Sequence, residues 1–462
     1  MSYLYRTASF GSSNDSSCVL SMWVKKTKND TLQGLFLGWN NSSNYTTCYV
    51  NNDDTIYYKE KQSNTQYETR ITSGARKFRD TNAWYHFVFQ WDYTQASASN
   101  RIKVWINGEL QTWENTGNLP PQNNTLRLKS SDFRIGDYTH AGSNYYNWKG
   151  LMSHVHFIDD ATYDTYQAST FGETDSTTGE WKIKPDPGIA TNNYGSQGFF
   201  VLKDGNSGTD QSGKGNNLST SGTITKTEDC PSNIFCTLNP LTNQGSYTFA
   251  HGNTYLEGNN TNAWTKGIGG TLAAKSGKYY WEVKQSPGSH TDYNIFGFMK
   301  ADNLMDTSAN LYSSGNMNSI QTHTTSVTIY GQTGTYSSYI KINGSTVGIS
   351  DNDIVSFALD LDNRKCWLAK NGVWVDDKNG NTNGSSINTS YPLWGTGEIT
   401  ADTSYTPTSI QYYDPQCYYN FGNGYFGNTA ISSAGTNASN NGIFEYDVPS
   451  GFTALSTKGL NL

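Results

Sequence analysis

The acidic residues that come closest to an enzymatic arrangement are Asp360 and Asp362, which stand two positions apart. Residues at this spacing lie on one face of a β-strand, and hydrolysis of a glycosidic bond usually needs two carboxyl groups that flank the bond. Asn363 follows directly, however, and Asp and Asn are residues that tight turns favour. We therefore expect this pair to shape a turn, and the sequence predicts no catalytic residue and no enzyme.

Metal-ligating side chains also occur, but no set of them is complete. His154 and His156 are spaced to share one strand face, yet no nearby cysteine or carboxylate supplies a third ligand. Asp204, Asn206 and Asp210 stand at alternating offsets among glycines, as in part of a calcium loop, but the terminal glutamate of that pattern is missing. A plain strand and a turn-rich connector are expected at these places. No metal and no other cofactor is predicted, although calcium is left open.

Aromatic side chains in polar loops are the better candidates for a binding function. Exposed aromatic faces stack on sugar rings and also anchor protein interfaces. The alternative is packing at the edges of β-sandwiches, which is slightly favoured because most aromatic side chains are largely buried. The candidate ligand-binding residues are Tyr145, Tyr146, Trp148, Tyr412, Tyr413, Tyr418 and Tyr419.

The composition of the 462 residues indicates an all-β protein. Charged residues make up only 15%, whereas aromatic residues make up 14%, which supplies buried area and argues against disorder. Thr and Tyr favour strands, while Gly and Asn favour turns. The net charge of −7 and the lack of a basic run argue against nucleic acid as a partner.

The sequence shows no signal for membrane insertion or secretion. No apolar run is long enough to span a bilayer, and the first residues do not form an ordinary secretory signal. The six cysteines are scattered without the paired spacing of metal ligands, so reduced thiols in a protein made in the cytosol are expected.

Strand signals recur along both halves of the chain. Residues 101–110, RIKVWINGEL, alternate, and Asn107-Gly108 supplies the positive φ angles of a tight hairpin. Residues 353–374 alternate in the same way, and Asn371-Gly372 turns the chain again. Many short strands between polar turns indicate antiparallel sandwiches or barrels. Further strands are expected at residues 18–25, 84–91, 150–158, 276–284 and 294–299, and residues 339–347 place Asn343-Gly344 between alternating residues.

A tract at residues 204–241 is nearly free of aliphatic periodicity and separates two strand-rich halves. Each half is large enough to form one sandwich. The expected domains are residues 1–185 and 246–462, with residues 186–245 as a partly ordered connector rich in Gly, Asn, Ser and Thr. Trp181, residues 230–236 and residues 238–241 predict that parts of this join pack against both domains.

Each half contains sequence motifs that resemble those of a known family. In the first half these are the strand with Trp23, residues 84–87, residues 102–110 and residues 150–160, and with them this half resembles the laminin-G-like, concanavalin-A-like lectin domains. In the second half residues 276–283, 296–298, 355–374 and 420–422 resemble a SPRY domain. The resemblance implies two jelly-roll-like β-sandwiches, concanavalin-A-like and then SPRY-like.

The join between the halves is more specific than either domain. Residues 171–175, 179–181, 210–217 and 236–241, with the closing residues 451–455, are similar to phrases in virion proteins of tailed bacteriophages, especially marine ones. Those proteins join a lectin-like domain to a SPRY domain and are usually called tail-fibre or structural proteins. The resemblance covers nearly the whole chain.

The resemblance implies a non-enzymatic protein on the virion surface, made in the host cytoplasm. Its partners would be other virion proteins, copies of itself on the particle and a host-surface glycan. One role is host recognition by glycan or protein contact. The alternatives are purely structural decoration of capsid or tail and, second, a polysaccharide depolymerase. Because no heptad stretch is present and the first strand begins almost at Met1, a compact appendage, an adaptor-docked fibre tip or a capsid-decorating knob is expected rather than an elongated trimeric fibre.

Overall fold

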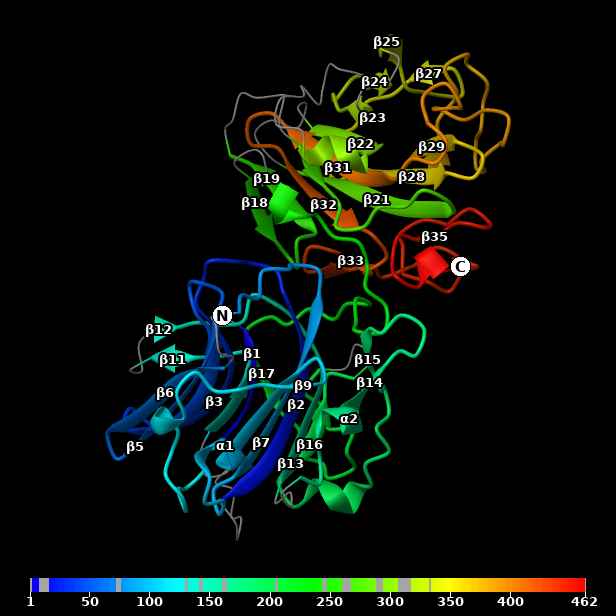
Figure 1. The fold of residues 1–462 in the computed structure, drawn as a ribbon. Coiled ribbons are helices and arrows are strands. Elements are labelled where there is room, and N and C mark those ends of the chain that lie inside the picture. The colour runs from blue at the N-terminus through cyan, green and yellow to red at the C-terminus, as the bar shows by residue number, and fades with distance from the viewer. Residues whose placement is uncertain are drawn as a thin grey trace. The chain divides into compact units, whose positions relative to one another are not determined.

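The computed structural model describes residues 2–7, 16–71, 76–128, 132–140, 144–159, 164–203, 207–242, 247–259, 267–287, 294–305, 317–331 and 334–461. The chain forms two compact units (Figure 1), Met1–Lys226 with Cys230–Ser232 and Thr227–Asp229 with Asn233–Leu462. Each unit is an antiparallel β-sandwich, which confirms the predicted fold class. No helix among the described residues is long and apolar enough to cross a bilayer.

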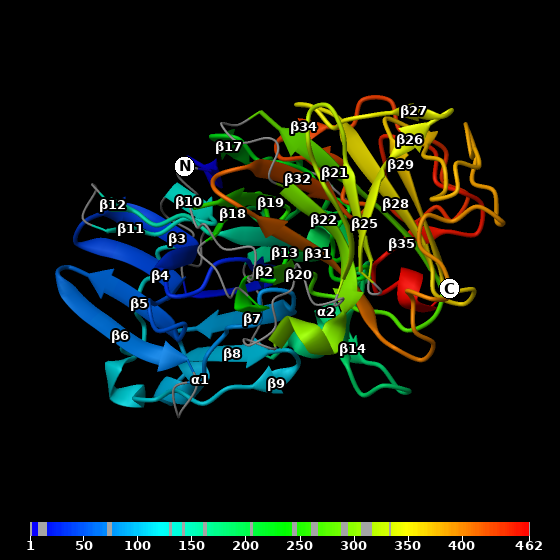
Figure 2. The same ribbon diagram turned by 90° about the horizontal axis from the view of Figure 1, so that it is seen from above.

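The first unit packs a seven-stranded sheet against a six-stranded sheet (Figure 2). Alternate residues of both sheets, such as Phe36 and Phe89, point into one core. The larger sheet has the order β17 (Ser219–Ser221), β1 (Tyr3–Arg6), β10 (Asp132–Ile135), β3 (Gln33–Asn41), β4 (Asn44–Val50), β5 (Ile56–Gln62) and β6 (Thr65–Ile71). The smaller sheet has the order β16 (Phe199–Val201), β13 (Gly150–Asp159), β2 (Ser17–Lys26), β7 (Trp84–Asp92), β8 (Ile102–Ile106) and β9 (Glu109–Leu110).

Short elements complete the first unit. They are the hairpins β11 (Thr139–His140) with β12 (Asn144–Tyr145) and β14 (Gly172–Thr174) with β15 (Trp181–Ile183), the helices α1 (Ala98–Arg101) and α2 (Ala168–Phe171), and the 3-10 turns η1 (Thr116–Asn118) and η2 (Thr191–Tyr194). The predicted Asn107-Gly108 turn joins β8 to β9 with φ angles of 49° and 83°. The strands predicted in this half are confirmed as β2, β7, β8 and β13.

A segment after β13 covers the outer face of the six-stranded sheet. Trp105 on that face packs against Phe171 of α2, and the Nε1–H of Trp181 donates to Nδ1 of His86 over 3.0 Å. Burial lowers the pKa of His86 to about 3, so the ring is neutral, and its Nε2–H then donates to Oγ of Ser21 at 2.9 Å. The central strands β2 and β7 of the six-stranded sheet are therefore buried on both faces.

The second unit also packs two sheets, and its core includes Trp281 and Phe296. The eight-stranded sheet has the order β18 (Tyr247–Ala250), β19 (Tyr255–Gly258), β32 (Gln416–Asn420), β21 (Lys278–Ser286), β28 (Ile354–Asp360), β29 (Lys365–Lys370) and β30 (Val373–Trp374), with β35 (Thr453–Ala454) parallel to β21. The six-stranded sheet has the order β20 (Ile268–Gly269), β31 (Tyr405–Gln411), β22 (Asn294–Lys300), β23 (Met317–Gln321), β24 (Thr328–Gly331) and β25 (Gly334–Tyr339). Smaller elements are β26 (Lys341–Ile342), β27 (Ser345–Thr346), β33 (Tyr425–Phe426), β34 (Thr429–Ala430), η3 (Pro240–Thr242), η5 (Ala301–Met305) and η6 (Gly459–Asn461).

The C-terminal residues cover part of the outer face of the eight-stranded sheet. Trp367 of β29 packs against Phe452 there. Glu282 of β21 anchors this segment, because its carboxylate accepts hydrogen bonds from the backbone N–H groups of Glu445 and Tyr446, each at 2.9 Å. Burial nevertheless raises the pKa of Glu282 to about 7.

Much of the segment expected as a connector, residues 186–245, belongs to the sheets and cores of the two units. β16 pairs with β13, and β17 pairs with β1, so this stretch completes the first unit up to Lys226. Phe235, Cys236 and Leu238 are buried in the second unit. The covering segment at residues 164–201 likewise folds back onto the first sandwich.

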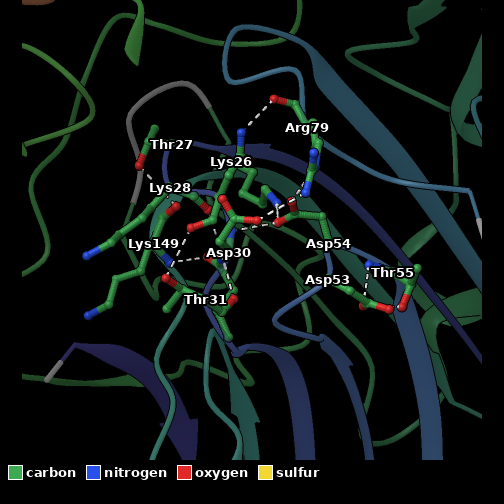
Figure 3. A network of polar contacts seen from close by, with 12 residues as sticks. Lys26, Thr27, Lys28, Asp30, Thr31, Asp53, Asp54, Thr55, Arg79 and Lys149 are labelled. Atoms are coloured by element: carbon green, nitrogen blue, oxygen red, sulfur yellow. Dashed lines mark hydrogen bonds and ion pairs between the residues drawn. The ribbon is translucent and has the colours of Figure 1, made fainter. Parts of the chain in front are cut away.

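A buried ion pair joins separate loops of the first unit (Figure 3). Lys26 ends β2 and Asp54 lies between β4 and β5; both side chains are almost fully buried, with 2.5 Å between Nζ and Oδ1. Asp54 also accepts hydrogen bonds from Nε of Arg79 at 2.8 Å and from the backbone N–H of Asp30 at 3.0 Å. Burial alone raises the pKa of Asp54, but the hydrogen bonds from Lys26 and the other donors outweigh it and hold the pKa below its usual value.

Replacing Asp54 by Ala is expected to destabilise the first unit by about 3–5 kcal/mol, because the Lys26 ammonium is left buried without its partner. Asp53→Ala is the matched control, since that carboxylate accepts only from Thr55 in a local turn and should cost under about 1 kcal/mol. Urea unfolding of both variants measures the difference. Equal, small losses would show that the ion pair contributes no stability.

Glu282 is expected to make the stability of the second unit depend on pH. Its folded pKa is about 7 against an ordinary value of 4.5, so between these values the folded unit holds a proton that the unfolded chain releases. The free energy of unfolding should therefore fall as pH rises from about 5 to about 7, by at most about 3 kcal/mol. Because Cys18 and Cys48 of the first unit are buried free thiols too, urea titrations are read by mass spectrometry of the peptides that carry Cys366 and Cys417, which report the second unit alone.

Glu282→Gln removes the titrating carboxyl, and the slope should disappear with it. The first unit provides a contrast, because Glu60, whose pKa burial also raises to about 7, is opposed by the neutral, buried His86. A depressed histidine pKa adds stability as pH rises toward about 6.5, so the two effects partly cancel there. A second unit whose stability stays level or rises from pH 5 to 7 would contradict the role given to Glu282.

Candidate binding site

The outer face of the seven-stranded sheet carries rows of aromatic and polar residues. These residues alternate with the core positions of their strands and so point away from the core. Strand pairing sets them in three rows: Trp39, Tyr45 and Lys61; Thr47, Lys59 and Glu68; Tyr49, Tyr57 and Arg70. None of the apolar clusters formed by the described residues includes them. Part of this face is buried, since Thr47, Tyr49 and Lys59 are at most 7% exposed. Its open part is formed by Tyr57, Glu68 and Arg70, which are partly exposed.

Four tyrosine rings form a continuous stack on this face, which we call the tyrosine ladder. The ring centroids of Tyr57 and Tyr49 lie 5.6 Å apart, those of Tyr49 and Tyr138 4.8 Å apart, and those of Tyr138 and Tyr146 5.9 Å apart. The inner rings of Tyr49 and Tyr138 are only 7% and 4% exposed. The end rings of Tyr57 and Tyr146 are half-buried and reach solvent. The buried inner pair thus holds the two end rings in place, and a ligand can contact these end rings.

The hairpin of β11 and β12 brings two of these rings over the sheet. Tyr138 and Tyr146 exchange two backbone hydrogen bonds of 3.3 and 2.8 Å. The loop lies so close to β3 that a Cβ on Gly34 would stand 2.3 Å from the backbone of Asp137, so this position excludes any side chain. The buried carboxylate of Asp137 accepts from Nδ2 of Asn147 at 3.1 Å and holds the returning strand of the loop.

Glu68 organises the polar groups beside the ladder. Its carboxylate accepts hydrogen bonds from the hydroxyl of Tyr49 and from Nε2 of Gln66, the latter at 2.8 Å. Burial, helped by Glu68, raises the pKa of Tyr49, so its hydroxyl stays protonated. Arg70 donates from Nε to the Tyr57 hydroxyl at 2.6 Å, and its guanidinium lies 5.3 Å from the centre of that ring. The face therefore joins fixed ring surfaces to charged hydrogen-bonding groups.

The predicted loop aromatics of the first half have three different outcomes. Tyr146 is part of the ladder. Trp148 packs at the edge of the core instead, and its Nε1–H donates to the carbonyl of Leu151 at 3.2 Å. The side chain of Tyr145 lies outside the described residues.

The predicted aromatics of the second half are also divided. Tyr412 and Tyr413 are half-buried and contact each other edge to face at 4.4 Å. Tyr418 and Tyr419 lie on β32 rather than in a loop, and neighbouring residues of a strand point to opposite faces. Tyr418 is half-buried on the outer face, whereas Tyr419 is 0% exposed in the core. The expectation of an exposed ligand-binding ring is therefore wrong for Tyr419.

The two acidic residues with glycosidase-like spacing stabilise a turn, as expected. Asp360 accepts from the backbone N–H and from Nδ2 of Asn363, at 2.9 and 2.8 Å. Asp362 accepts from the backbone N–H of Gly277 at 2.8 Å. Their oxygens thus satisfy main-chain and amide donors at the tip of a hairpin.

The candidate metal ligands do not converge among the residues described. His154 sits at a β-bulge with a φ of 47°, and Nδ1 of His156 lies 2.8 Å from the Tyr194 hydroxyl. Asp204 and Asn206 lie outside the described residues. Asp210 accepts four hydrogen bonds within its loop, from the backbone N–H groups of residues 200, 212 and 216 and from the hydroxyl of residue 212. No group of three or more His, Cys, Asp or Glu in this part of the chain could hold a metal ion.

Three residues of the ladder, Tyr49, Tyr57 and Tyr138, were missed by the sequence analysis. Tyr49 and Tyr57 lie in the stretches NYTTCYV and IYYKEKQ, where tyrosines alternate with the buried Cys48 and Ile56. That alternation was a usable strand signal. The stacking with Tyr138 was not predictable, because it depends on how the β11–β12 hairpin lies over β3.

Residues 4–166 match the family described as the concanavalin A-like lectin/glucanases superfamily. The match spans the strands from β1 to β13, so this part of the first unit is similar to that family, as the sequence resemblance implied. No curated protein matches the chain.

Solved structures similar to the chain have low TM-scores. The SPRY domain of human HERC1 has 14% identity and a TM-score of 0.28, and the match covers 39% of this chain and 96% of that one. The TRIM65 PSpry domain has 11% identity and a TM-score of 0.28, with 40% and 91% covered. A heptameric SAP-like pentraxin from Limulus polyphemus has 16% identity and a TM-score of 0.25, with 35% and 71% covered. The SPRY resemblance of the second half therefore rests on its sequence motifs.

Proposed function

We propose that this protein is a non-enzymatic component of the outside of a tailed-phage virion that binds host-surface glycans through the tyrosine ladder. One observation carries the binding role: a lectin-like sandwich leaves one sheet face partly open and fixes a row of tyrosine rings on it. Prearranged rings bind at a lower entropic cost than mobile ones.

The chemistry of the face suits an uncharged sugar chain. The half-buried rings of Tyr57 and Tyr146 offer apolar surface to the C–H faces of pyranose rings. Arg70 and Glu68 lie beside them as donor and acceptor for sugar hydroxyls. Lys59 lies 3.6 Å from Glu68, and Arg70 lies 3.1 Å from Glu114. The charges of these two pairs offset each other, which favours a neutral glycan over an anionic one.

Binding through this face needs no calcium. Asp30 and Asp54, two acidic residues of the first unit, are paired with Arg79 and Lys26. Both oxygens of Asp54 are already engaged by these cations and by a backbone N–H. The ladder itself is built from tyrosine rings, so we expect it to contact a glycan directly and without a bridging metal ion.

The virion location rests on the phrases at the join of the two halves, residues 171–175, 210–217 and 236–241, which resemble those of tailed-phage structural proteins. The protein would be present there in several copies beside other virion proteins. A purely decorative role is the alternative, and it predicts particle contacts without glycan binding.

Tyr57→Ala is expected to weaken glycan binding about tenfold, because one exposed stacking ring is lost. Binding of the full chain to immobilised surface polysaccharides of marine bacteria, measured by biolayer interferometry, tests this expectation. EDTA should leave the affinity unchanged. Tyr339→Ala is the matched control, since Tyr339 is 49% exposed on β25 and belongs to the second unit rather than to the ladder.

Three results would contradict the proposed binding role. They are no binding to any surface polysaccharide, equal affinity of wild type and Tyr57→Ala, and complete loss of binding in EDTA. Release of reducing ends from the bound polysaccharide would instead favour the depolymerase alternative, which needs two opposed carboxyl groups.

Gold-labelled antibody against this chain is expected to mark the outside of intact phage particles in electron micrographs. Phage that lack the protein should assemble and keep their genome but adsorb to host cells more slowly, because a receptor contact is removed. Unchanged adsorption together with particles that break at lower temperature would support decoration instead. Absence of label from purified particles would overturn the virion assignment.

A further inference from the structure

The outer face of the eight-stranded sheet in the second unit is covered on one half only. On β21, β28 and β29 the apolar side chains of Tyr280, Ala358 and Trp367 lie beneath the C-terminal segment. On β19 and β32 the outer positions hold Tyr255 and Tyr418, which are half-buried and belong to none of the apolar clusters of the described residues. The same sheet thus has an apolar, covered half and an aromatic, polar half.

Three rings meet on the second half, and we call them the tyrosine–histidine cluster: His251, Tyr255 and Tyr418. Tyr255 and Tyr418 are direct cross-strand partners with ring centroids 5.0 Å apart. His251, exposed in the turn after β18, lies 5.9 Å from Tyr255 and 6.0 Å from Tyr418. The turn at Gly427 braces the cluster, because a Cβ there would stand 2.7 Å from the Tyr418 ring.

Polar groups stand directly beside the rings. Glu257 and Gln416 form the next cross-strand pair on the same face of the sheet, and Nε2 of Gln416 donates to Oε1 of Glu257 at 3.0 Å. Lys284 is the partner of Tyr418 on β21 and lies over the ring of Phe426 at 5.9 Å. One acidic and one basic side chain therefore flank the cluster, and their charges offset each other.

We infer that the tyrosine–histidine cluster, with Glu257 and Gln416, is a second carbohydrate-binding site that takes a neutral saccharide. Ring faces held by strand pairing supply a platform for the C–H face of a pyranose. Beside the rings, the Glu257 carboxylate accepts hydrogen bonds from the hydroxyls of the sugar, and the Gln416 amide donates to them. A purely apolar partner does not suit this face, because it would bury Glu257 and Lys284 without new hydrogen bonds. The inference depends on contacts within the second unit and not on the tyrosine ladder.

The experiment uses the full chain and a glycan microarray of bacterial surface saccharides, followed by hydrogen–deuterium exchange with one bound oligosaccharide. Wild type is expected to show protection in peptides that cover β19 and β32. Tyr418→Ala should abolish that protection and weaken binding at this site about tenfold. Glu257→Ala, which removes a hydroxyl acceptor at the surface, should weaken it as well, and Tyr339→Ala should not.

The variants separate this inference from the proposed role of the first unit. If Tyr57→Ala removes all glycan binding while Tyr418→Ala and Glu257→Ala change nothing, the second site is overturned and the ladder stands. If protection of β19 and β32 persists in Tyr57→Ala, the second site stands whatever happens to the ladder. Protection confined to β4, β5 and β6, or no bound saccharide at all, also overturns the second site.

Discussion

The structure depends on one constraint: each sheet of a sandwich has two faces, and the core accepts only one of them. The other face must be covered by further chain or must carry side chains that tolerate water. In the first unit the two solutions occur on opposite sides. Trp105 and Val88 lie on the outer face of the six-stranded sheet beneath α2 and η2, whereas the partly exposed Tyr57, Glu68 and Arg70 lie on the outer face of the seven-stranded sheet.

The same constraint explains where the Gly- and Asn-rich join goes. An outer face that carries Val19, Val88 and Ile158 exposes too much apolar surface to remain bare, and residues 164–201 fold back to cover it. The Trp181–His86–Ser21 hydrogen bonds give this covering a fixed position as well as apolar contact. A segment that looks like a linker in the sequence therefore forms a structural layer, because its few aromatic residues pack on the apolar outer face of the sheet.

The sequence predicted what depends on near neighbours. Asn107-Gly108, Asn343-Gly344 and Asn371-Gly372 all adopt the positive φ angles that their residue types favour, and the strands around them were predicted with nearly correct bounds. It did not predict β17, whose partner β1 lies at the other end of the unit. Tyr418 and Tyr419 show a further limit, since one step along a strand separates a surface ring from a core ring. The alternation of Gln416, Cys417, Tyr418 and Tyr419 indicates which of the two rings faces the core.

The proposed sites share a property that bears on how such a protein would work. Each offers only a few half-buried rings, and an aromatic contact contributes about 1 kcal/mol beyond the area that it buries. Two or three such contacts with a few hydrogen bonds give millimolar affinity, about −4 kcal/mol, for a single site. Useful attachment to a cell surface then requires many sites acting together, because linked sites raise the local ligand concentration for one another. If the protein is repeated over a virion as proposed, such weak contacts would together give a strong attachment while each contact stays reversible.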